Sequence, residues 1–183
     1  LIIDGITLVA GENGCGKSTL LSSLAGWFKP CGGAVLLGGQ AITQVAPAQR
    51  ALAMAWQTQQ DECPFPLTAL EKTLTGRHPH LSRWEWESDA DLALAQQQLA
   101  RLDLADFGAR DLASLSGGER RRVSLATVLT QQAPLLLLDE PTAALDIAHQ
   151  EQVLTIARRR AGEGDAVVVV LHDLAHRLLQ HGQ

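Results

Sequence analysis

A glycine-rich loop between an apolar run and a helical pattern is the feature that most constrains this chain. Residues 6–9 form the apolar run, and the loop follows at residues 11–18 with the sequence GENGCGKS. Glycines let backbone N–H groups turn inward around phosphate oxygens, where side chains would obstruct the approach. Lys17 and Ser18 end the loop, at the positions that reach the phosphates and a magnesium ion. The loop therefore predicts a nucleotide-binding α/β fold, with a strand before it and a helix after it, which we expect to end near Gly26.

Apolar runs and helical patterns alternate along much of the remaining chain. Four leucines at residues 135–138 and the valine-rich residues 166–171 are typical of strands buried on both faces. Such alternation predicts a parallel sheet with helices on both faces. Further elements are expected as a strand at residues 34–37 and helices at residues 120–129 and 147–160.

Two acidic residues, Asp139 and Glu140, end the leucine strand. The carboxyl ends of parallel strands form the sheet edge at which α/β proteins bind ligands. Asp139 would there hold magnesium through water, and Glu140 would be the general base that polarises an attacking water. The alternative is an acidic turn after a core strand, and Pro141 together with the upstream phosphate loop weighs against it.

A second candidate phosphate surface lies at residues 115–119, LSGGE. A helix N-terminus with a hydroxyl and two glycines favours an anion, so Ser116, Gly117 and Gly118 are candidates for phosphate contact. A simple helix start is the alternative, because Ser-Gly-Gly also occurs by chance. The arginine run at residues 120–122 is interpreted as a solvated helix face rather than a nucleic-acid site.

The strand signal disappears in the middle of the chain. Alanine, leucine, glutamine and aspartate dominate there, and Ser88 with Asp91 has the spacing of a helix cap and its reciprocal acid. These features predict an inserted α-helical subdomain. We expect one domain, in which residues 1–60 and 125–183 form the nucleotide-binding core and residues 61–124 form the helical subdomain with the Ser-Gly-Gly motif.

Composition restricts the partners. Fifteen lysines and arginines stand against 20 aspartates and glutamates, and a formal net charge of −5 gives no basic footprint for nucleic acid. No apolar run approaches the roughly 18 to 20 residues that span a bilayer. The three cysteines, at positions 15, 31 and 63, lack the paired spacing of a zinc site or a disulfide framework. We expect a cytosolic protein whose membrane role would come through a partner.

Taken in order, the phosphate loop, the Ser-Gly-Gly motif and the strand ending in Asp-Glu resemble the ATP-binding-cassette (ABC) ATPases. The likeness runs over nearly all 183 residues. It implies a P-loop (RecA-like) ATP hydrolase that binds ATP and Mg²⁺ and works as a head-to-tail homodimer. It also implies an importer subunit on the cytoplasmic side of the bacterial inner membrane, docked on transmembrane permease subunits and served indirectly by a substrate-binding protein.

The resemblance assigns roles to individual residues. The ATP contacts implied for the phosphate loop are those of Gly11, Asn13, Gly14, Cys15, Gly16, Lys17, Ser18 and Thr19. In the family, the loop that matches Ser116, Gly117 and Gly118 contacts the γ-phosphate bound by the opposite subunit. Asp146 matches the loop that crosses the dimer interface.

Catalytic and metal-binding roles follow in the same way. Gln57 matches the glutamine that senses magnesium and the attacking water, with its register left open by Gln59 and Gln60. His172 ends the predicted strand at residues 166–171 and matches the histidine that contacts the γ-phosphate, although a lone histidine is usually structural. The implied catalytic set is Glu140, His172 and Gln57, and the implied metal set is Ser18, Gln57 and Asp139.

Two stretches are similar to importers of iron chelates such as siderophores, of haem or of cobalamin: residues 76–80, GRHPH, and residues 145–150, LDIAHQ. The alternative class is a non-transport ABC ATPase of the DNA-repair, chromosome or translation type. Those proteins carry long coiled coils, zinc modules or a second cassette, and this sequence has none of them. A degenerate nucleotide-binding regulator would lack Glu140 or His172, and both are present.

Compared with the family, N- and C-terminal parts are expected to be missing. The first strand enters the phosphate loop after only ten residues, and no aromatic residue precedes Gly11 to stack on adenine. At the other end, residues 177–183 stop short of the closing strands that family members have.

The surface between Gln57 and Trp86 is a candidate docking site for a membrane partner. It includes Phe65 in an apolar loop, and Trp84 and Trp86 lie two apart, so that an amphipathic helix would bury at most one of them. Exposed large aromatics are candidate interface anchors. The alternative is that Phe65 and one tryptophan pack between the helical subdomain and the sheet.

Overall fold

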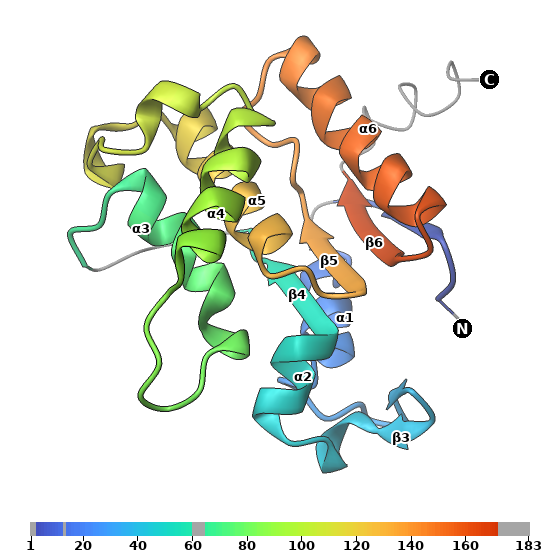
Figure 1. Cartoon of the computed structure of the whole chain (residues 1–183). Coiled ribbons are helices and arrows are strands. Elements are labelled where there is room, and N and C mark those ends of the chain that lie inside the picture. Colours follow the sequence, from blue (N-terminus) through green and yellow to red (C-terminus); the bar gives the residue numbers. More distant parts are fainter. Residues whose placement is uncertain (1–2, 13, 60–64, 172–183) are drawn as a thin grey trace.

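The computed structural model describes residues 3–12, 14–59 and 65–171, and its centre is a four-stranded parallel sheet in the order β1-β6-β5-β4 (Figure 1). The strands are β1 (Ile6–Ala10), β4 (Met54–Gln57), β5 (Leu135–Asp139) and β6 (Ala166–Leu171). The predicted strand at residues 166–171 is confirmed at both ends. The leucine strand is confirmed and continues by one residue, through Asp139.

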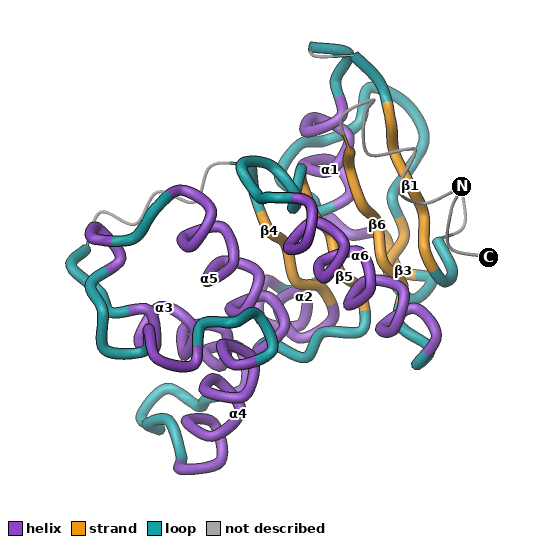
Figure 2. Tube along the Cα trace, turned by 90° about the horizontal axis from the view of Figure 1, so that it is seen from above, coloured by secondary structure: helices purple, strands orange, loops and turns teal. Residues whose placement is uncertain are grey.

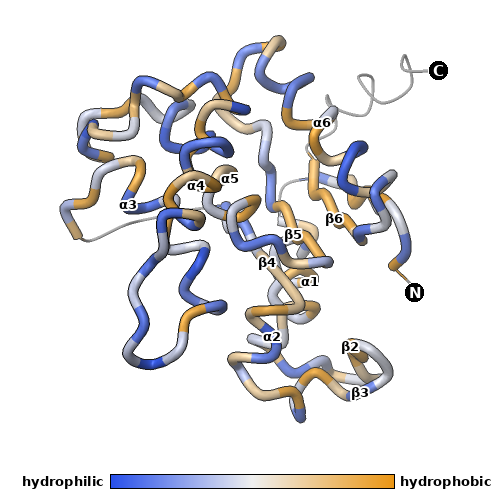
Figure 3. Tube along the Cα trace, viewed as in Figure 1, coloured by the Kyte–Doolittle hydropathy of each residue, from blue (hydrophilic) through white to orange (hydrophobic). Residues whose placement is uncertain are grey.

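Both faces of the two central strands are buried, which explains their continuous apolar sequences. Leu136 and Leu138 of β5 pack into one hydrophobic cluster, and Leu137 packs into another on the opposite face. β6 alternates in the same way, with Val167 and Val168 on opposite faces. Figure 3 shows β5 and β6 as apolar segments at the centre of the molecule.

Helices cover both faces of the sheet, as the alternation of the sequence predicts (Figure 2). On one face, α1 (Lys17–Leu24) packs Leu21 into the cluster that contains Leu137. On the other face, α5 (Gly117–Thr130) and α6 (Ile147–Gly162) pack against β5 and β6. The expected helices at residues 120–129 and 147–160 lie within α5 and α6.

The strand expected at residues 34–37 is half as long as predicted. Only β2 (Leu36–Leu37) forms, and it pairs with β3 (Gln40–Ala41) in a hairpin outside the main sheet. Gly38 and Gly39 have positive φ angles of 57° and 83°, which a two-residue hairpin turn requires. Residues 34 and 35 lie outside the strand, between it and the bend at Gly33, which also has a positive φ. A 3-10 turn, η1 (Ile42–Gln44), and α2 (Pro47–Ala53) then lead into β4.

The helical part of the chain packs around α5. It comprises α3 (Ala69–Leu74), η2 (Thr75–His80), α4 (Asp89–Ala100), η3 (Ala105–Phe107) and η4 (Leu112–Ser114). Ser88 and Asp91 form the predicted capping box at the start of α4. α5 contacts α3, α4 and also β4, and it runs unbroken through residue 124. The proposed boundary between subdomains at residues 124–125 therefore falls inside a continuous helix. Within the part of the chain described, none of the helices has the length and apolarity needed to cross a bilayer.

Candidate nucleotide site

The phosphate loop closes around its own lysine. Gly16 precedes α1 with a φ of 96°, and Gly14 has a φ of 80°, so both occupy the left-handed region that glycine adopts without strain. Lys17 is buried, and its Nζ donates to the carbonyls of Gly11 and Glu12 at 2.7 and 2.9 Å. The ammonium therefore lies inside the loop, where phosphate oxygens would accept from it. Asn13 lies outside the described residues.

Other loop residues show why small side chains are needed there. A Cβ on Gly11 would lie 2.8 Å from Sγ of Cys15, which is closer than such atoms pack. Ser18 and Thr19 follow Lys17 in the first turn of α1, and both residues are exposed. The backbone at the start of α1 and the Lys17 charge together favour an anion.

Asp139 lies buried at the carboxyl edge of the sheet. Burial raises the pKa of its carboxyl group, as does the neighbouring charge of Glu140, whereas a hydrogen bond with the Ser18 hydroxyl and the charges of Arg121 and Lys17 lower it. Its Oδ1 has no hydrogen-bond partner among the described residues. A buried, unpaired carboxylate oxygen beside a hydroxyl is a donor set that suits a hard divalent cation, so the residues present fit the Mg²⁺ implied by the family.

Glu140 is held in an uncommon backbone conformation at the same edge. Its φ is 49°, its N–H donates to the carbonyl of Val170 at 3.0 Å, and its Oε2 accepts from Nε2 of Gln59 at 3.1 Å. Non-glycine residues in the left-handed region persist where surrounding contacts enforce them, and they cluster at functional sites. Glu140 is only partly buried, so this residue is accessible to solvent at the sheet edge.

The structure brings Gln59, and not Gln57, to Glu140. Gln57 ends β4 with a buried side chain, and its Nε2 donates to the carbonyl of Arg121 in α5 at 3.1 Å. Its Oε1 has no partner within the described ranges. The sequence left open whether Gln57 or Gln59 faces the acidic residues. In the structure the side chain of Gln59 contacts Glu140, whereas that of Gln57 contacts the backbone of α5.

The Ser-Gly-Gly motif begins α5 with a reciprocal cap. Oγ of Ser116 accepts from the backbone N–H of Glu119 at 3.3 Å, and the N–H of Ser116 donates to Oε2 of Glu119 at 2.6 Å. The hydrogen bonds from Ser116 lower the pKa of Glu119. Gly117 faces open space, whereas a Cβ on Gly118 would lie 2.9 Å from the carbonyl oxygen of Ala144.

This motif lines a groove with Asp146 and His149, and no described residue of the phosphate loop contributes to it. Asp146 caps α6, where it accepts from the backbone N–H of His149 at 2.9 Å and lies 2.7 Å from His149 Nδ1. The backbone bond and the ring contact with His149 lower the pKa of Asp146. Ser116, Gly118 and Asp146 thus share one surface, separate from the loop that surrounds Lys17.

The interpretation of the arginine run as a solvated face is wrong for Arg121. This side chain is buried and donates to four backbone carbonyls, at Thr58, Gln59, Asp139 and Glu140. Arg120 is exposed, and Arg122 is partly buried with a bond to the Leu102 carbonyl at 2.7 Å. One signal was available: residues 121, 125 and 128 share the spacing of a single helix face, and Leu125 and Val128 are buried.

Two other groups of predicted residues remain. His172 and Cys63 lie outside the described residues. Phe65 is 70% exposed, and Trp84 and Trp86 are each 86% exposed. Residues 81–88, which carry the two tryptophans, form no helix.

Comparison with known proteins places these features in a family. The family model described as "ABC transporter" matches residues 4–143, which include the phosphate loop, the Ser-Gly-Gly motif and Asp139-Glu140. The hemin import ATP-binding protein HmuV of Streptomyces coelicolor is 46% identical over 172 residues, which are 93% of this chain and 60% of that protein.

A cobalamin import ATP-binding protein, BtuD of Halobacterium salinarum, is 44% identical over 91% of this chain and 42% of its own length. Among solved structures, a dimeric bacterial ABC transporter cassette superposes with a TM-score of 0.83 at 28% identity, over 95% of this chain and 78% of that one. The chain therefore spans only part of its relatives, and within that part it belongs to the ABC transporter family.

Proposed function

We propose that this chain is the ATP-binding and ATP-hydrolysing part of an ABC importer subunit. One observation carries the proposal. At the carboxyl edge of the sheet, the buried Asp139 has an unpaired oxygen and a hydrogen bond with Ser18 of the phosphate loop, and Glu140 follows directly. The residues proposed to bind phosphate, to bind the cation and to act as the general base are thus close together at this edge of the sheet.

Each residue would contribute a distinct step. Loop amides and the Lys17 ammonium would hold the β- and γ-phosphates of ATP, with Nζ exchanging the Gly11 and Glu12 carbonyls for phosphate oxygens. Ser18 and Asp139 would hold Mg²⁺, which when bound neutralises phosphate charge. Glu140 would accept a proton from water as that water attacks the γ-phosphorus and ADP leaves.

A second subunit would complete the site. Ser116, Gly117 and Gly118 open onto a groove that the phosphate loop does not line. Backbone N–H groups at the start of α5 suit an anion, and a head-to-tail homodimer would place the γ-phosphate of the opposite subunit there. The dimeric cassette that this chain resembles supports the arrangement. Asp146, in the same groove, would cross the interface.

We further propose that the transported substrate is an iron chelate, haem or cobalamin. The support is the naming of the relatives as hemin and cobalamin import proteins and the segment at residues 76–80. The partners would be permease subunits, with a substrate-binding protein acting indirectly, and the chain would lie on the cytoplasmic side of the membrane. Transport of labelled haem or cobalamin by vesicles with the cognate permease tests this assignment, since a non-transport ABC ATPase would give no uptake.

The activity itself is tested by replacing the proposed base. Glu140→Gln removes the proton acceptor and preserves the side-chain volume, so ATP binding is retained while phosphate release falls by about 10² to 10⁴-fold. Glu163→Gln is the matched control, because Glu163 pairs only with exposed Arg159 on α6 among the contacts described. Phosphate release within about threefold of wild type in Glu140→Gln would exclude Glu140 as the base.

A further inference from the structure

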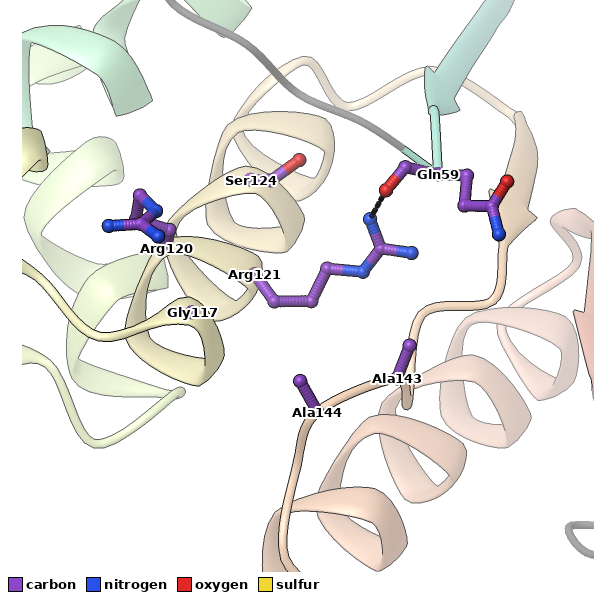
Figure 4. A pocket seen from close by; sticks show the side chains of 7 residues that line it. All are labelled: Gln59, Gly117, Arg120, Arg121, Ser124, Ala143 and Ala144. Atoms are coloured by element: carbon purple, nitrogen blue, oxygen red, sulfur yellow. Dashed lines mark hydrogen bonds between the residues drawn. The ribbon is translucent and has the colours of Figure 1, made fainter.

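One buried guanidinium joins three parts of the candidate site. Nη1 of Arg121 donates to the carbonyls of Thr58 and Gln59 at 2.9 and 2.7 Å. Nη2 donates to the carbonyls of Asp139 and Glu140 at 2.6 and 2.7 Å. Figure 4 shows the side chain leaving α5 and reaching across to Gln59, above the chain at Ala143 and Ala144. The segments that leave β4 and β5 are thereby fixed to α5.

The contacts converge on groups that carry the proposed chemistry. Gln59 and Glu140 are bonded to each other through their side chains at 3.1 Å, and Arg121 holds the carbonyls of both. Arg121 also accepts, through its own carbonyl, from Nε2 of Gln57. The residue lies five positions after Ser116, within the first turns of the helix that presents the Ser-Gly-Gly surface.

The geometry needs the planar fork of arginine. Glu140 stands at a φ of 49°, and its carbonyl accepts both from Arg121 and from the N–H of Ala143. A lysine carries its donors on a single nitrogen, so it cannot span the four carbonyls that the two terminal nitrogens of arginine reach. Charge alone would therefore not reproduce the arrangement.

We propose that Arg121 is a positioning residue that fixes Glu140 and Gln59 relative to the Ser116–Gly118 surface of the same subunit. The consequence of this inference rests on the proposed function. In the proposed dimer, the Arg121 guanidinium sets the distance between Glu140, the base of one ATP site, and the Ser116–Gly118 surface, which contacts the ATP of the other site. Arg121 touches neither ATP nor water in this role.

The test uses Arg121→Lys, with Arg121→Gln as a second variant and Arg160→Gln as the control. Arg160 is a partly buried arginine on α6 that is bonded to the Ala133 carbonyl and to Asp165, at the other end of β5 and β6. Hydrogen exchange is followed in peptides covering residues 54–59 and 139–146. Steady-state turnover and ATP affinity are measured in parallel.

Arg121→Lys should fold, exchange faster in those two peptides and lose at least tenfold in kcat, with ATP Kd within about threefold of wild type. The control should lower stability without either effect. Unchanged exchange in both peptides, or a loss of ATP affinity as large as the loss of kcat, would overturn the proposal. If wild type itself fails to hydrolyse ATP, the proposed function fails, and the exchange comparison still decides whether Arg121 holds the two segments.

Discussion

The two glycines of the Ser-Gly-Gly motif should respond differently to the same added methyl group. A Cβ on Gly117 meets nothing within 4 Å, whereas a Cβ on Gly118 would lie 2.9 Å from the backbone oxygen of Ala144. Backbone cannot move aside as a flexible side chain can. Gly118→Ala therefore forces α5 away from the segment that leads to Asp146, and Gly117→Ala leaves this packing intact.

The expected magnitude follows from two opposing terms. Overpacking at a well-packed contact costs about 1–3 kcal/mol. Alanine gains up to about 1 kcal/mol over glycine in a helix, and this gain applies to both variants. The difference in unfolding free energy between the variants should therefore be about 1–3 kcal/mol, with Gly118→Ala the less stable. For a domain of this size, each kcal/mol corresponds to about 2–4 °C in Tm.

Urea unfolding and ATP turnover of both variants test this reasoning. Gly117→Ala should be at least as stable as wild type yet lose turnover, because its methyl group projects from the open groove surface proposed to receive the phosphate of the other subunit. Gly118→Ala should lose stability as well as turnover. Equal unfolding free energies for the two variants would refute the packing argument, and full turnover in Gly117→Ala would refute the assigned surface.

Two further predictions concern the helical part of the chain. Hydrogen bonds from Ser88, and then the bond and charge of Arg77, lower the pKa of Asp91 from 3.8 to about 2. Since the folded pKa lies below the unfolded one, this stabilisation is complete above pH 3.8 and is lost as the pH falls towards 2. The unfolding free energy of Asp91→Asn should not show this loss between pH 3.8 and about 2. Urea unfolding that gives the same pH dependence of the unfolding free energy for both proteins would contradict the assignment. Phe65→Ala should leave basal ATP turnover largely unchanged, because the residue is 70% exposed. Turnover of this variant should no longer respond to permease and substrate. Equal loss of basal activity and folding stability would instead identify Phe65 as a core residue.

The elements that the sequence specified well are those in which local pattern and burial agree. Both ends of β6 were predicted correctly because its residues form a continuous apolar run, which is the pattern of a strand buried on both faces. The capping box of Ser88 and Asp91 is a local contact within one turn, so its spacing alone identifies it. The strand at residues 34–37 was overestimated because an apolar run does not show which of its residues pair with a neighbouring strand, and only residues 36 and 37 do so.

The site was predictable as a set of residue types and less so as a set of contacts. Asp139 and Glu140 follow from a buried strand that ends in acids. The choice between Gln57 and Gln59 depends on which neighbour each side chain faces, and those neighbours lie more than 60 residues away in sequence. Arg121 was misread for the same reason, because its acceptors are backbone carbonyls at distant strand ends, which have no sequence signature.

The closed phosphate loop has a thermodynamic consequence for any nucleotide that enters it. Lys17 already satisfies two acceptors, the carbonyls of Gly11 and Glu12. An incoming polyphosphate must therefore compete with these carbonyls for two of the three ammonium donors, and at those two donors the net gain is the difference between phosphate and carbonyl as acceptors. Where phosphate takes both of those donors, the two carbonyls are released and need other hydrogen-bond partners. The affinity of this loop for a ligand thus depends on how much more strongly the ligand accepts hydrogen bonds from Lys17 than the two carbonyls do. A ligand without a charged phosphate would gain little from this exchange.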